Sequence, residues 1–370
     1  PVPTKAPTAT AKPSASSLRV VLPGTVPTLD YHWTTTTPTM TVGWHMFETL
    51  LAPDKDRVPR PQLADQVSIS ADGLTYDFQL RKGIKFHNGK EMTSADVVAS
   101  LTRWGNIASV GKTVFKAVDG VDPVGAYGVR IRLKRPYASL VSALAAWGQA
   151  AVIMPKEVID AAGSDQVKDF IGTGPYKFVE WKRDQYIKLT RYDEYQPRPE
   201  PPSFISGKRE ALIRDLLFIP GNLDNAARIA GVQAGDYDFV MLISPDSYAQ
   251  MQRNPSLSFS ICKPYQMRFV FLNCSIPPFN DVKMRQAVQA ALNGEQVREA
   301  YGPKEFSRMS PSLMSFGGVW ENDAGKEYYS QNNPEKARRL AKEAGYKGEP
   351  LVYMTDQTNS AVYRCCVTVT

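Results

Sequence analysis

The run of residues 74–81 constrains the fold of this chain more than any other segment. Every second residue of the run is apolar, and these residues are Leu74, Tyr76, Phe78 and Leu80. A period of two is that of a β-strand with one buried face. Turn signals bound the run at residues 72–73 and 82–83, which are Asp-Gly and Lys-Gly. The chain is therefore predicted to contain a sheet, with residues 84–86 as a return strand.

Helical patterns surround this strand. Thr93 with Asp96 three residues later resembles a capping box, and the apolar residues behind it recur at helical spacing. These apolar residues are Val97, Leu101 and Trp104. Further helices are expected at residues 43–51, at 281–292 behind a capping Asp281 and at 333–345, and a short strand at 18–22. Helices and strands without regular alternation predict an α/β or α+β body of several lobes.

Composition and charge exclude several classes of protein. The 370 residues are 43% hydrophobic and 22% charged, which is typical of globular chains and leaves room for two or three compact units. The longest apolar stretch, around residues 141–154, is broken by Gly148 and Gln149, so no membrane-spanning helix is predicted. The net charge of +7 is scattered along the chain. Its densest basic strip, residues 129–135, alternates with apolar residues as a solvated strand face does, so nucleic acid is not an expected partner.

The sequence carries no catalytic or metal-binding signature. It has no nucleophile elbow, phosphate loop or zincin motif, and its four cysteines form no C-x-x-C pair. Cys262 and Cys274 either pair across a hairpin or stay as unpaired buried thiols. His32 and His45 form a weak metal pair without an acidic or thiol companion, and His87 is expected at the surface. No catalytic residue, metal or cofactor is predicted.

Residues 1–17 have the composition of a tether. They contain only Pro, Val, Thr, Lys, Ala and Ser, which offer little to bury and favour extended chain. Such a segment suits an exported protein held at a surface, and a cytosolic linker has the same composition. Because no initiator Met is present, a processed or trimmed form is expected.

An ordered set of short motifs runs through the chain. In the first half they include Thr28-Leu29-Asp30, Phe47-Glu48-Thr49-Leu50-Leu51, Pro61-Gln62-Leu63-Ala64, the strand at 72–81, and residues 84–89 and 93–97. In the second half they include Gly172-Thr173-Gly174-Pro175-Tyr176 and residues 233–238, 277–287 and 333–346. In this order the motifs resemble those of the extracellular solute-binding proteins of ABC importers, family 5, the peptide/nickel-binding type. Tyr31 replaces the proline that usually follows the first motif.

This resemblance implies an α/β fold of the periplasmic-binding-protein-like type II, a two-lobed clamp with an extra inserted domain. Residues 18–41 and 172–260 would form lobe one, 42–171 the inserted domain and 261–370 lobe two, which is incomplete by comparison with the family. The implied function is not enzymatic. The protein would capture an oligopeptide or similar small solute between its lobes and deliver it to a membrane permease with a partner ATPase. It would be a monomer in the periplasm or at the outer face of the cytoplasmic membrane, with lipid anchoring left open.

The resemblance also places ligand contacts. They are Tyr31, His32, Trp33, Thr34, Trp104, Met241, Leu242, Ile243, Ser244, Ser315, Phe316 and Tyr353. The residues themselves favour a site-lining loop at 31–33, in an irregular polar segment, whereas Trp104 suits the core of its helix equally well. The acidic residue that holds a peptide's amine in this family would lie beyond Thr370. Nickel chelates, oligosaccharides and aromatic acids therefore stay open as solutes, and a peptide-holding chaperone or a hydrolase stays open as another class.

Overall fold

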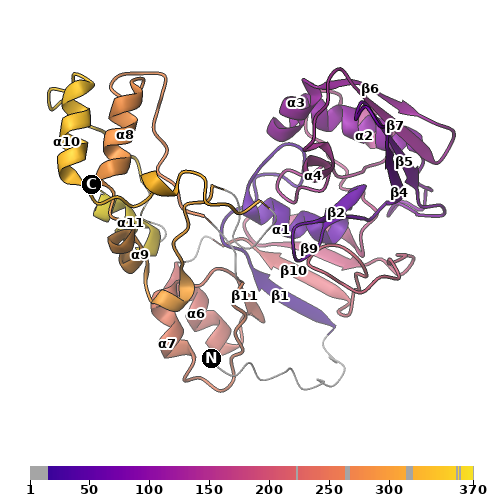
Figure 1. Ribbon diagram of the computed structural model, residues 1–370. Coiled ribbons are helices and arrows are strands. Elements are labelled where there is room, and N and C mark those ends of the chain that lie inside the picture. The colour runs from indigo at the N-terminus through magenta and orange to yellow at the C-terminus, as the bar shows by residue number, and fades with distance from the viewer. Residues whose placement is uncertain are drawn as a thin grey trace. The chain divides into compact units, whose positions relative to one another are not determined.

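The computed structural model describes residues 16–221, 224–262, 267–313, 320–355, 357 and 360–369. The chain divides into two compact units, Pro1–Met241 and Leu242–Thr370. The first unit contains three sheets and the helices beside them (Figure 1). The described residues of the second unit form helices and irregular segments. In the part of the chain that the structure describes, no helix has the length and apolar character needed to cross a membrane.

A five-stranded sheet in the order β11-β1-β10-β9-β8 organises one half of the first unit. β1 (Ser17–Val21) pairs in parallel with β10 (Asp215–Ile219) and with the short β11 (Phe239–Val240). β9 (Tyr186–Arg191) and β8 (Tyr176–Lys182) continue the sheet in antiparallel pairing. The strand predicted at residues 18–22 is confirmed to within one residue, and its apolar side chains enter the core.

A four-stranded antiparallel sheet in the order β4-β5-β7-β6 organises the other half. Its strands are β4 (Ala64–Ile69), β5 (Thr75–Leu80), β7 (Gly128–Leu133) and β6 (Val118–Pro123). The predicted strand at 74–81 is confirmed as β5, with its alternate apolar residues buried. The basic strip is also confirmed as a solvated face, because the apolar residues of β7 point inward while Arg130 Nε donates to Asp77 Oδ1 at 2.7 Å outside.

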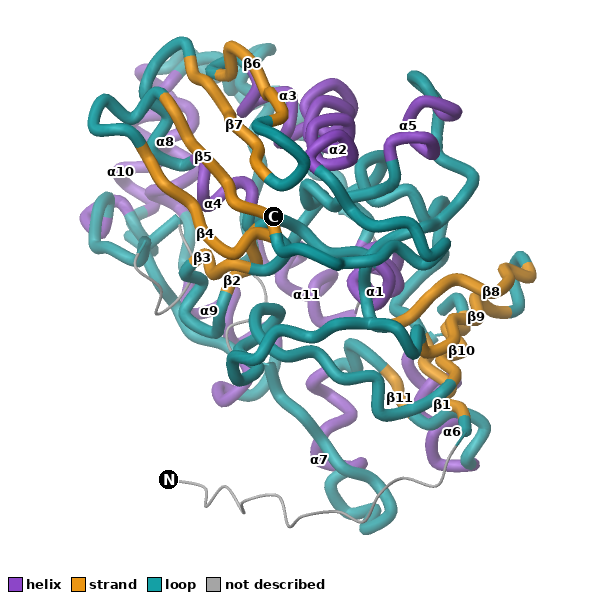
Figure 2. The backbone as a smooth tube through the Cα atoms, turned by 90° about the vertical axis from the view of Figure 1, so that its right-hand side faces the viewer, coloured by secondary structure: helices purple, strands orange, loops and turns teal. Residues whose placement is uncertain are grey.

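Helix α2 (Ser94–Ile107) covers the four-stranded sheet (Figure 2). The capping box predicted for Thr93 and Asp96 is present, and Val97, Leu101 and Trp104 are buried as their spacing predicted. The shorter helix α3 (Ser109–Phe115) packs beside it, and α4 (Leu140–Leu144) packs against α3 and β2. The four-stranded sheet and this helix enclose a hydrophobic core of their own, which includes Trp104.

Two local predictions are wrong. The helix expected at 43–51 is replaced by α1 (Thr37–Met46), followed by β2 (Leu51–Pro53), which pairs with β3 (Pro59–Pro61). Pro38 in the first turn of α1 favours the earlier start, and pairing with β3 holds the apolar residues after Met46 in extended chain. The return strand at 84–86 does not form, because β5 pairs with β4 and β7 and only an isolated bridge joins Lys85 to Glu91.

Buried apolar residues of the first unit form two clusters, one against each large sheet. The cluster of the five-stranded sheet also takes residues from α1 and from α5 (Lys156–Ala162). Helix α6 (Asn225–Ala234) packs beside β11. The lobe boundaries expected at 41, 171 and 260 stay a prediction, since the compact units meet at 241/242 and separate no inserted domain from lobe one.

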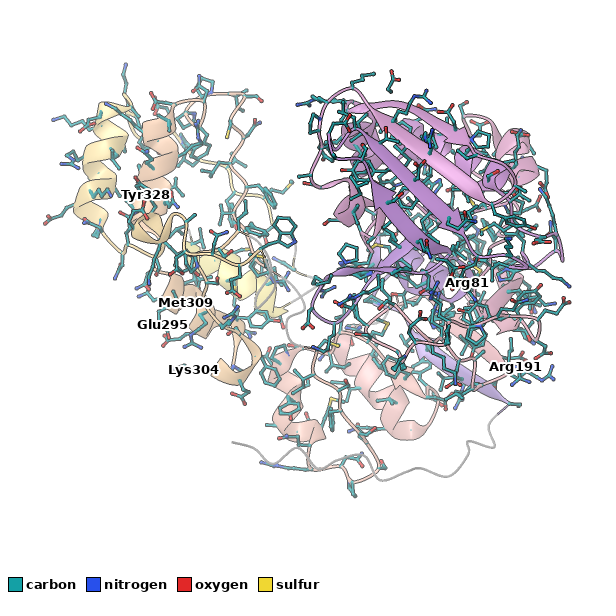
Figure 3. The ribbon with its side chains drawn as sticks, turned by 45° about the vertical axis from the view of Figure 1, so that its right-hand side comes forward. Arg81, Arg191, Glu295, Lys304, Met309 and Tyr328 are labelled. Carbon is teal, nitrogen blue, oxygen red and sulfur yellow. The ribbon has the colours of Figure 1, made fainter. Side chains whose placement is uncertain are left out.

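Helices are the regular elements of the second unit where it is described. Its helices are α7 (Tyr248–Met251), α8 (Val282–Ala291), α9 (Gly294–Tyr301), α10 (Pro334–Glu343) and α11 (Ser360–Val369), with 3-10 turns η1 (Pro245–Ser247), η2 (Lys304–Phe306) and η3 (Lys326–Tyr328). α8 packs on α10 and α9 on α11. The predicted helices behind Asp281 and Asn333 are confirmed, and both side chains cap their helix. Glu295 and Lys304 lie at the surface of this unit (Figure 3).

Cys262 and Cys274 are free and exposed. The structure therefore supports neither a disulfide across a hairpin nor a pair of buried thiols. Both residues lie in irregular segments, where no packed face covers their side chains.

Candidate functional site

The loop after β1 is held in shape by a buried carboxylate. Asp30 is fully buried, and its two oxygens accept hydrogen bonds from Arg103 Nη1 at 3.1 Å and Nη2 at 2.6 Å. The backbone N–H groups of His32 and Val167 also donate to this carboxylate, at 3.1 and 3.0 Å. Because Arg103 projects from α2, one ion pair joins three segments that are far apart in sequence.

His32 supports the loop from inside. Its side chain is fully buried, and Nδ1 lies 3.3 Å from Arg103 Nη1, which can only donate. Nδ1 therefore accepts, and Nε2 carries the proton that it donates to the carbonyl of Val152 at 3.1 Å. Burial lowers the pKa of His32 to about 4, so the ring is neutral at physiological pH and acts as a structural link.

Tyr31 belongs to an aromatic group next to this loop. Its ring is fully buried and meets Trp44 edge-on, with ring centroids 5.6 Å apart. The Tyr31 hydroxyl and Trp44 Nε1 both donate to the carbonyl of Trp147, at 2.8 and 3.2 Å. Burial raises the pKa of Tyr31 well above its ordinary value. These two hydrogen bonds hold the backbone of Trp147 in place, while the residue itself is 39% exposed.

Trp33 lines a groove of about 1,040 Å³. The groove runs along the outer face of α2, and α5 forms another wall; Ala95, Ala99, Thr102, Arg103, Asn106 and Ile159 are among its lining residues. The Trp33 ring is 40% exposed. The groove therefore combines a mostly apolar floor with one accessible indole, which suits a small amphipathic molecule.

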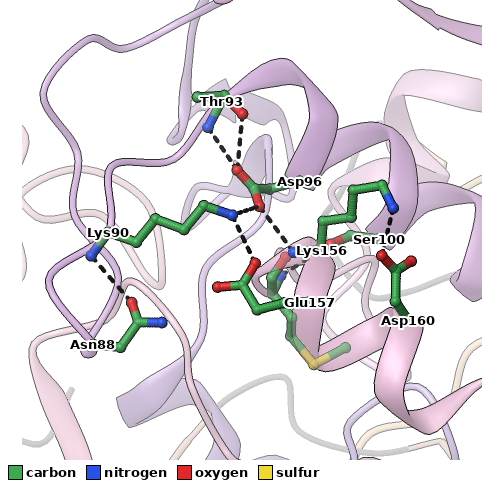
Figure 4. A network of polar contacts seen from close by, with 9 residues as sticks. Asn88, Lys90, Thr93, Asp96, Ser100, Lys156, Glu157 and Asp160 are labelled. Carbon is green, nitrogen blue, oxygen red and sulfur yellow. Dashed lines mark hydrogen bonds and ion pairs between the residues drawn. The ribbon is translucent and has the colours of Figure 1, made fainter.

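A polar network ties α2 to α5 beside this groove (Figure 4). Asp96 Oδ1 accepts from Lys90 Nζ at 2.9 Å and from the backbone N–H of Lys156 at 2.8 Å. Lys90 also binds Glu157 Oε2 at 2.7 Å. The pKa of Asp96 is lowered because these hydrogen bonds together outweigh its burial. One carboxylate thus caps α2 and anchors the start of α5.

Trp104 lies elsewhere. It is fully buried in the core of the four-stranded sheet, its Nε1 donates to the carbonyl of Gln149 at 2.8 Å, and its ring meets Phe115 edge-on. These contacts are those of the core residue that its helical spacing also allowed. The ligand role of Trp104 stays a prediction.

The remaining candidates are distributed over both units. Thr34 is partly buried and bonds to Thr36, and Met241 packs against the core of the five-stranded sheet. Leu242 is exposed, and Ser244 caps the turn that begins at Pro245. Ile243 and Tyr353 are partly buried, and a hydrogen bond with Cys366 raises the pKa of Tyr353 to about 12. Ser315 and Phe316 lie outside the described residues, and the set as a whole stays a prediction.

His87 is not a surface residue. Its Nδ1 accepts from the N–H of Gly172 at 3.2 Å, and Nε2 donates to the carbonyl of Gly174 at 3.0 Å. Burial lowers the pKa of this ring to about 4. A Cβ on Gly172 or Gly174 would meet the backbone of Met46, so only glycine allows this close approach. The Asn-Gly turn beside His87 favoured an exposed side chain, but the ring instead bonds to the backbone of Gly172, 85 residues away in sequence.

Residues that sequence reasoning missed hold the site together. Asp30 was part of a motif, but nothing in its neighbourhood pointed to Arg103 as its partner, and Trp147 gave only an isolated aromatic signal. Within the described ranges, no group of three or more His, Cys, Asp or Glu side chains is arranged to hold a metal ion.

Comparisons with a family model and with known proteins point to the same family. The model of the bacterial extracellular solute-binding proteins, family 5 Middle, matches residues 58–369. A probable peptide ABC transporter periplasmic-binding protein, y4tO of Sinorhizobium fredii, is 31% identical over 315 residues, covering 84% of this chain and 59% of the relative. The glutathione-binding protein GsiB of Pectobacterium atrosepticum is 28% identical over 337 residues, covering 90% of this chain and 62% of the relative. The chain thus spans about three fifths of the length of these relatives.

Solved structures agree in fold. MoaA of A. tumefacien R10, in complex with mannopinic acid, aligns with a TM-score of 0.73 and 25% identity, covering 90% of this chain and 66% of that one. The oligopeptide-binding protein AppA of Bacillus subtilis, in complex with a nonapeptide, aligns with a TM-score of 0.69 and 23% identity over the same shares. These are type II periplasmic binding proteins, so the predicted fold class is confirmed. The chain belongs to the family 5 bacterial extracellular solute-binding proteins.

Proposed function

We propose that this chain is the solute-binding component of an ABC importer, which captures an oligopeptide or similar small solute and delivers it to a membrane permease. The observation that carries the proposal is the family match over residues 58–369. The relatives named as peptide- and glutathione-binding proteins support the solute class. In this proposal a partner ATPase drives the permease, the binding protein is a monomer, and it works in the periplasm or at the outer face of the cytoplasmic membrane.

The predicted ligand contacts differ in solvent exposure, and we assign them two roles on this basis. Trp33 is accessible and lines the groove beside α2, so we assign it a direct contact with solute. Tyr31 and His32 are fully buried and bond to backbone carbonyls, so in this proposal they position the loop that carries Trp33. Thr34, Trp104, Met241, Leu242, Ile243, Ser244 and Tyr353, together with Ser315 and Phe316, complete the proposed set.

A thermal-shift screen of the full chain tests the function. The solutes are di- to pentapeptides, glutathione, sugar–amino-acid conjugates such as mannopinic acid, nickel–histidine chelates and aromatic acids. A solute at 100 times its Kd stabilises the folded state by about 2.7 kcal/mol, which is visible as a raised melting temperature. A hit in one class, weakened in Trp33→Ala and retained in the exposed Trp320→Ala control, supports the proposal.

Two results would contradict it. No shift with any solute of the screen would remove the binding function from this chain. Hydrolysis of a peptide or conjugate by the purified protein, followed by mass spectrometry, would replace capture with catalysis.

A further inference from the structure

Arg57, Trp147 and Phe204 form a cluster in the first unit, named the Arg57 cluster here. The guanidinium carbon of Arg57 lies 4.3 Å from the ring centroid of Phe204 and 5.9 Å from that of Trp147. Arg57 comes from the turn between β2 and β3, Trp147 from the segment after α4, and Phe204 from the loop before β10. Three distant segments therefore place one cation against two aromatic rings.

The cation of Arg57 has no counter-ion in the described structure. The two carboxylates of its own turn are engaged elsewhere: Asp54 Oδ2 accepts from Arg60 Nε at 2.7 Å, and Asp56 Oδ2 pairs with Lys55 Nζ at 2.6 Å. Arg57 Nη1 is buried and has no hydrogen-bond partner among the described residues. Because Nη1 is itself covered by protein, a solute would meet the guanidinium at Nε and Nη2, for which no hydrogen bond to a described residue is found.

Residues in the Arg57 cluster and next to it have a strained backbone. Arg57 has a φ of 65° and Phe204 a φ of 56°, and Gln149, two residues after Trp147, has a φ of 48°. Only seven non-glycine residues of the described chain have a positive φ, so three of the seven belong to this cluster or adjoin it. The left-handed conformation is unfavourable for a residue with a side chain, because its Cβ approaches the following carbonyl oxygen. Such strain persists where the surroundings enforce it, and it is concentrated at ligand sites.

Hydrogen bonds hold the segments that carry the Arg57 cluster in place. The carbonyl of Trp147 accepts hydrogen bonds from Tyr31 and Trp44. The turn that carries Phe204 is closed by reciprocal backbone bonds between Ser203 and Ser206, at 3.0 and 3.1 Å. The N–H of Lys55 donates to Ser203 Oγ at 3.1 Å and joins this turn to the Arg57 turn. Trp147 and Phe204 are nevertheless 39% and 51% exposed, so two partly exposed aromatic residues lie beside a cation without a counter-ion among the described residues.

We propose that the Arg57 cluster is a subsite for a carboxylate carried beside a planar or apolar group. The guanidinium offers a planar fork of N–H donors that matches a carboxylate, and the two rings offer apolar contact to the group next to it. The inference rests on the proposed function and deepens it, because the subsite would select acidic members among the small solutes. A cationic group is disfavoured here by the charge of Arg57 itself.

The test uses the full chain and a matched pair of small probes, 3-phenylpropanoate and 3-phenylpropanamide. Binding is measured by calorimetry and by ligand-observed NMR. We expect the acid to bind at least about tenfold more tightly than the amide, as a charge-assisted hydrogen bond implies. Arg57→Gln should remove this difference. Lys55→Gln makes the same charge change two residues away, at an exposed ammonium that, among the described residues, pairs with the adjacent Asp56, and should leave the difference intact.

A second measurement needs no variant. Phenylglyoxal modifies accessible guanidinium groups, and peptide mass spectrometry reads the modification at Arg57. We expect the acid, but not the amide, to protect Arg57. Equal binding of acid and amide, no binding of the acid, an unchanged preference in Arg57→Gln, or no protection would each overturn the subsite.

The outcomes separate this inference from the proposed function. If solutes of the thermal-shift screen bind wild type and Arg57→Gln alike, the importer function stands and the subsite fails. If the acid probe binds in an Arg57-dependent way while no solute of the screen shifts the melting temperature, the subsite stands and the proposed function fails.

Discussion

Removal of the Asp30 carboxylate should destabilise the first unit more than any exposed substitution. The Arg103–Asp30 pair joins Nη2 to Oδ2 at 2.6 Å, and the two side chains are 2% and 0% exposed. Asp30→Ala leaves the Arg103 charge buried without its counter-ion, with hydrogen bonds only to the carbonyl of Asp165 and to His32 Nδ1 among the described residues, which costs about 3–5 kcal/mol. It also leaves the N–H groups of His32 and Val167 without their acceptor, at a further cost of about 1 kcal/mol or more.

The expected loss is therefore at least about 4 kcal/mol, a large share of the 5–15 kcal/mol that usually stabilises a domain. Urea unfolding followed by circular dichroism and tryptophan fluorescence measures it. Asp77→Asn, which breaks an exposed ion pair with Arg130, is the control and should change the urea midpoint far less. In Asp30→Leu/Arg103→Met no charge is left buried, so this double variant should be more stable than Asp30→Ala.

Two results would contradict a stabilising role of the Asp30–Arg103 pair. If Asp30→Ala loses less than about 1 kcal/mol, the buried ion pair contributes little and water or another residue satisfies Arg103. If the loss of stability in Asp30→Leu/Arg103→Met, relative to wild type, equals the sum of the losses in the two single variants, the two residues do not act as a pair.

Three further predictions concern pH, packing and thiol reactivity. Burial lowers the pKa of His32, His45 and His87 to about 4, so the unfolded chain binds protons before the folded chain does as the pH falls. The free energy of unfolding should therefore be constant above about pH 6.5 and decline toward pH 4. A urea midpoint that stays flat over this window would contradict the burial of these rings. Gly172→Ala places a Cβ against the backbone of Met46 and should lower the melting temperature. Gly163→Ser is the control, because Gly163 lies at a solvent-exposed turn where an added Cβ would meet no atom. Its melting temperature should change less, since the positive φ of residue 163 is then the only source of strain. Cys262 and Cys274 are exposed, while burial raises the pKa of Cys365, so iodoacetamide should label the first two before Cys365 in the native protein, and equal rates by mass spectrometry would count against the described packing.

Local pattern was sufficient where neighbours in sequence provide the constraint. The alternation at 74–81 became β5, the capping box of Thr93 and Asp96 became the start of α2, and Asp281 and Asn333 cap α8 and α10. A strand's face and a helix's cap are set by residues two to four positions apart, so a single sequence reveals them.

Local pattern failed where a distant segment competes. The apolar residues after Met46 suit a helix, but pairing of β2 with β3 holds them extended. His87 beside its turn looked exposed until Gly172 and Gly174 enclosed both ring nitrogens. In each case the partner's sequence position gave no signal, because hydrogen bonds across the fold depend on the path of the whole chain.

The sequence by itself determined the strand at β5, the starts of α2, α8 and α10, the class of fold and the family, since these follow from periodicity, capping residues and an ordered set of motifs. Only the tertiary structure decided which side chains meet: Asp30 with Arg103, Trp147 with Tyr31 and Trp44, and Arg57 with the two rings. The physical reason is that a buried charge or an exposed ring acquires its chemistry from what surrounds it. In this chain those surroundings come from segments tens to more than a hundred residues away.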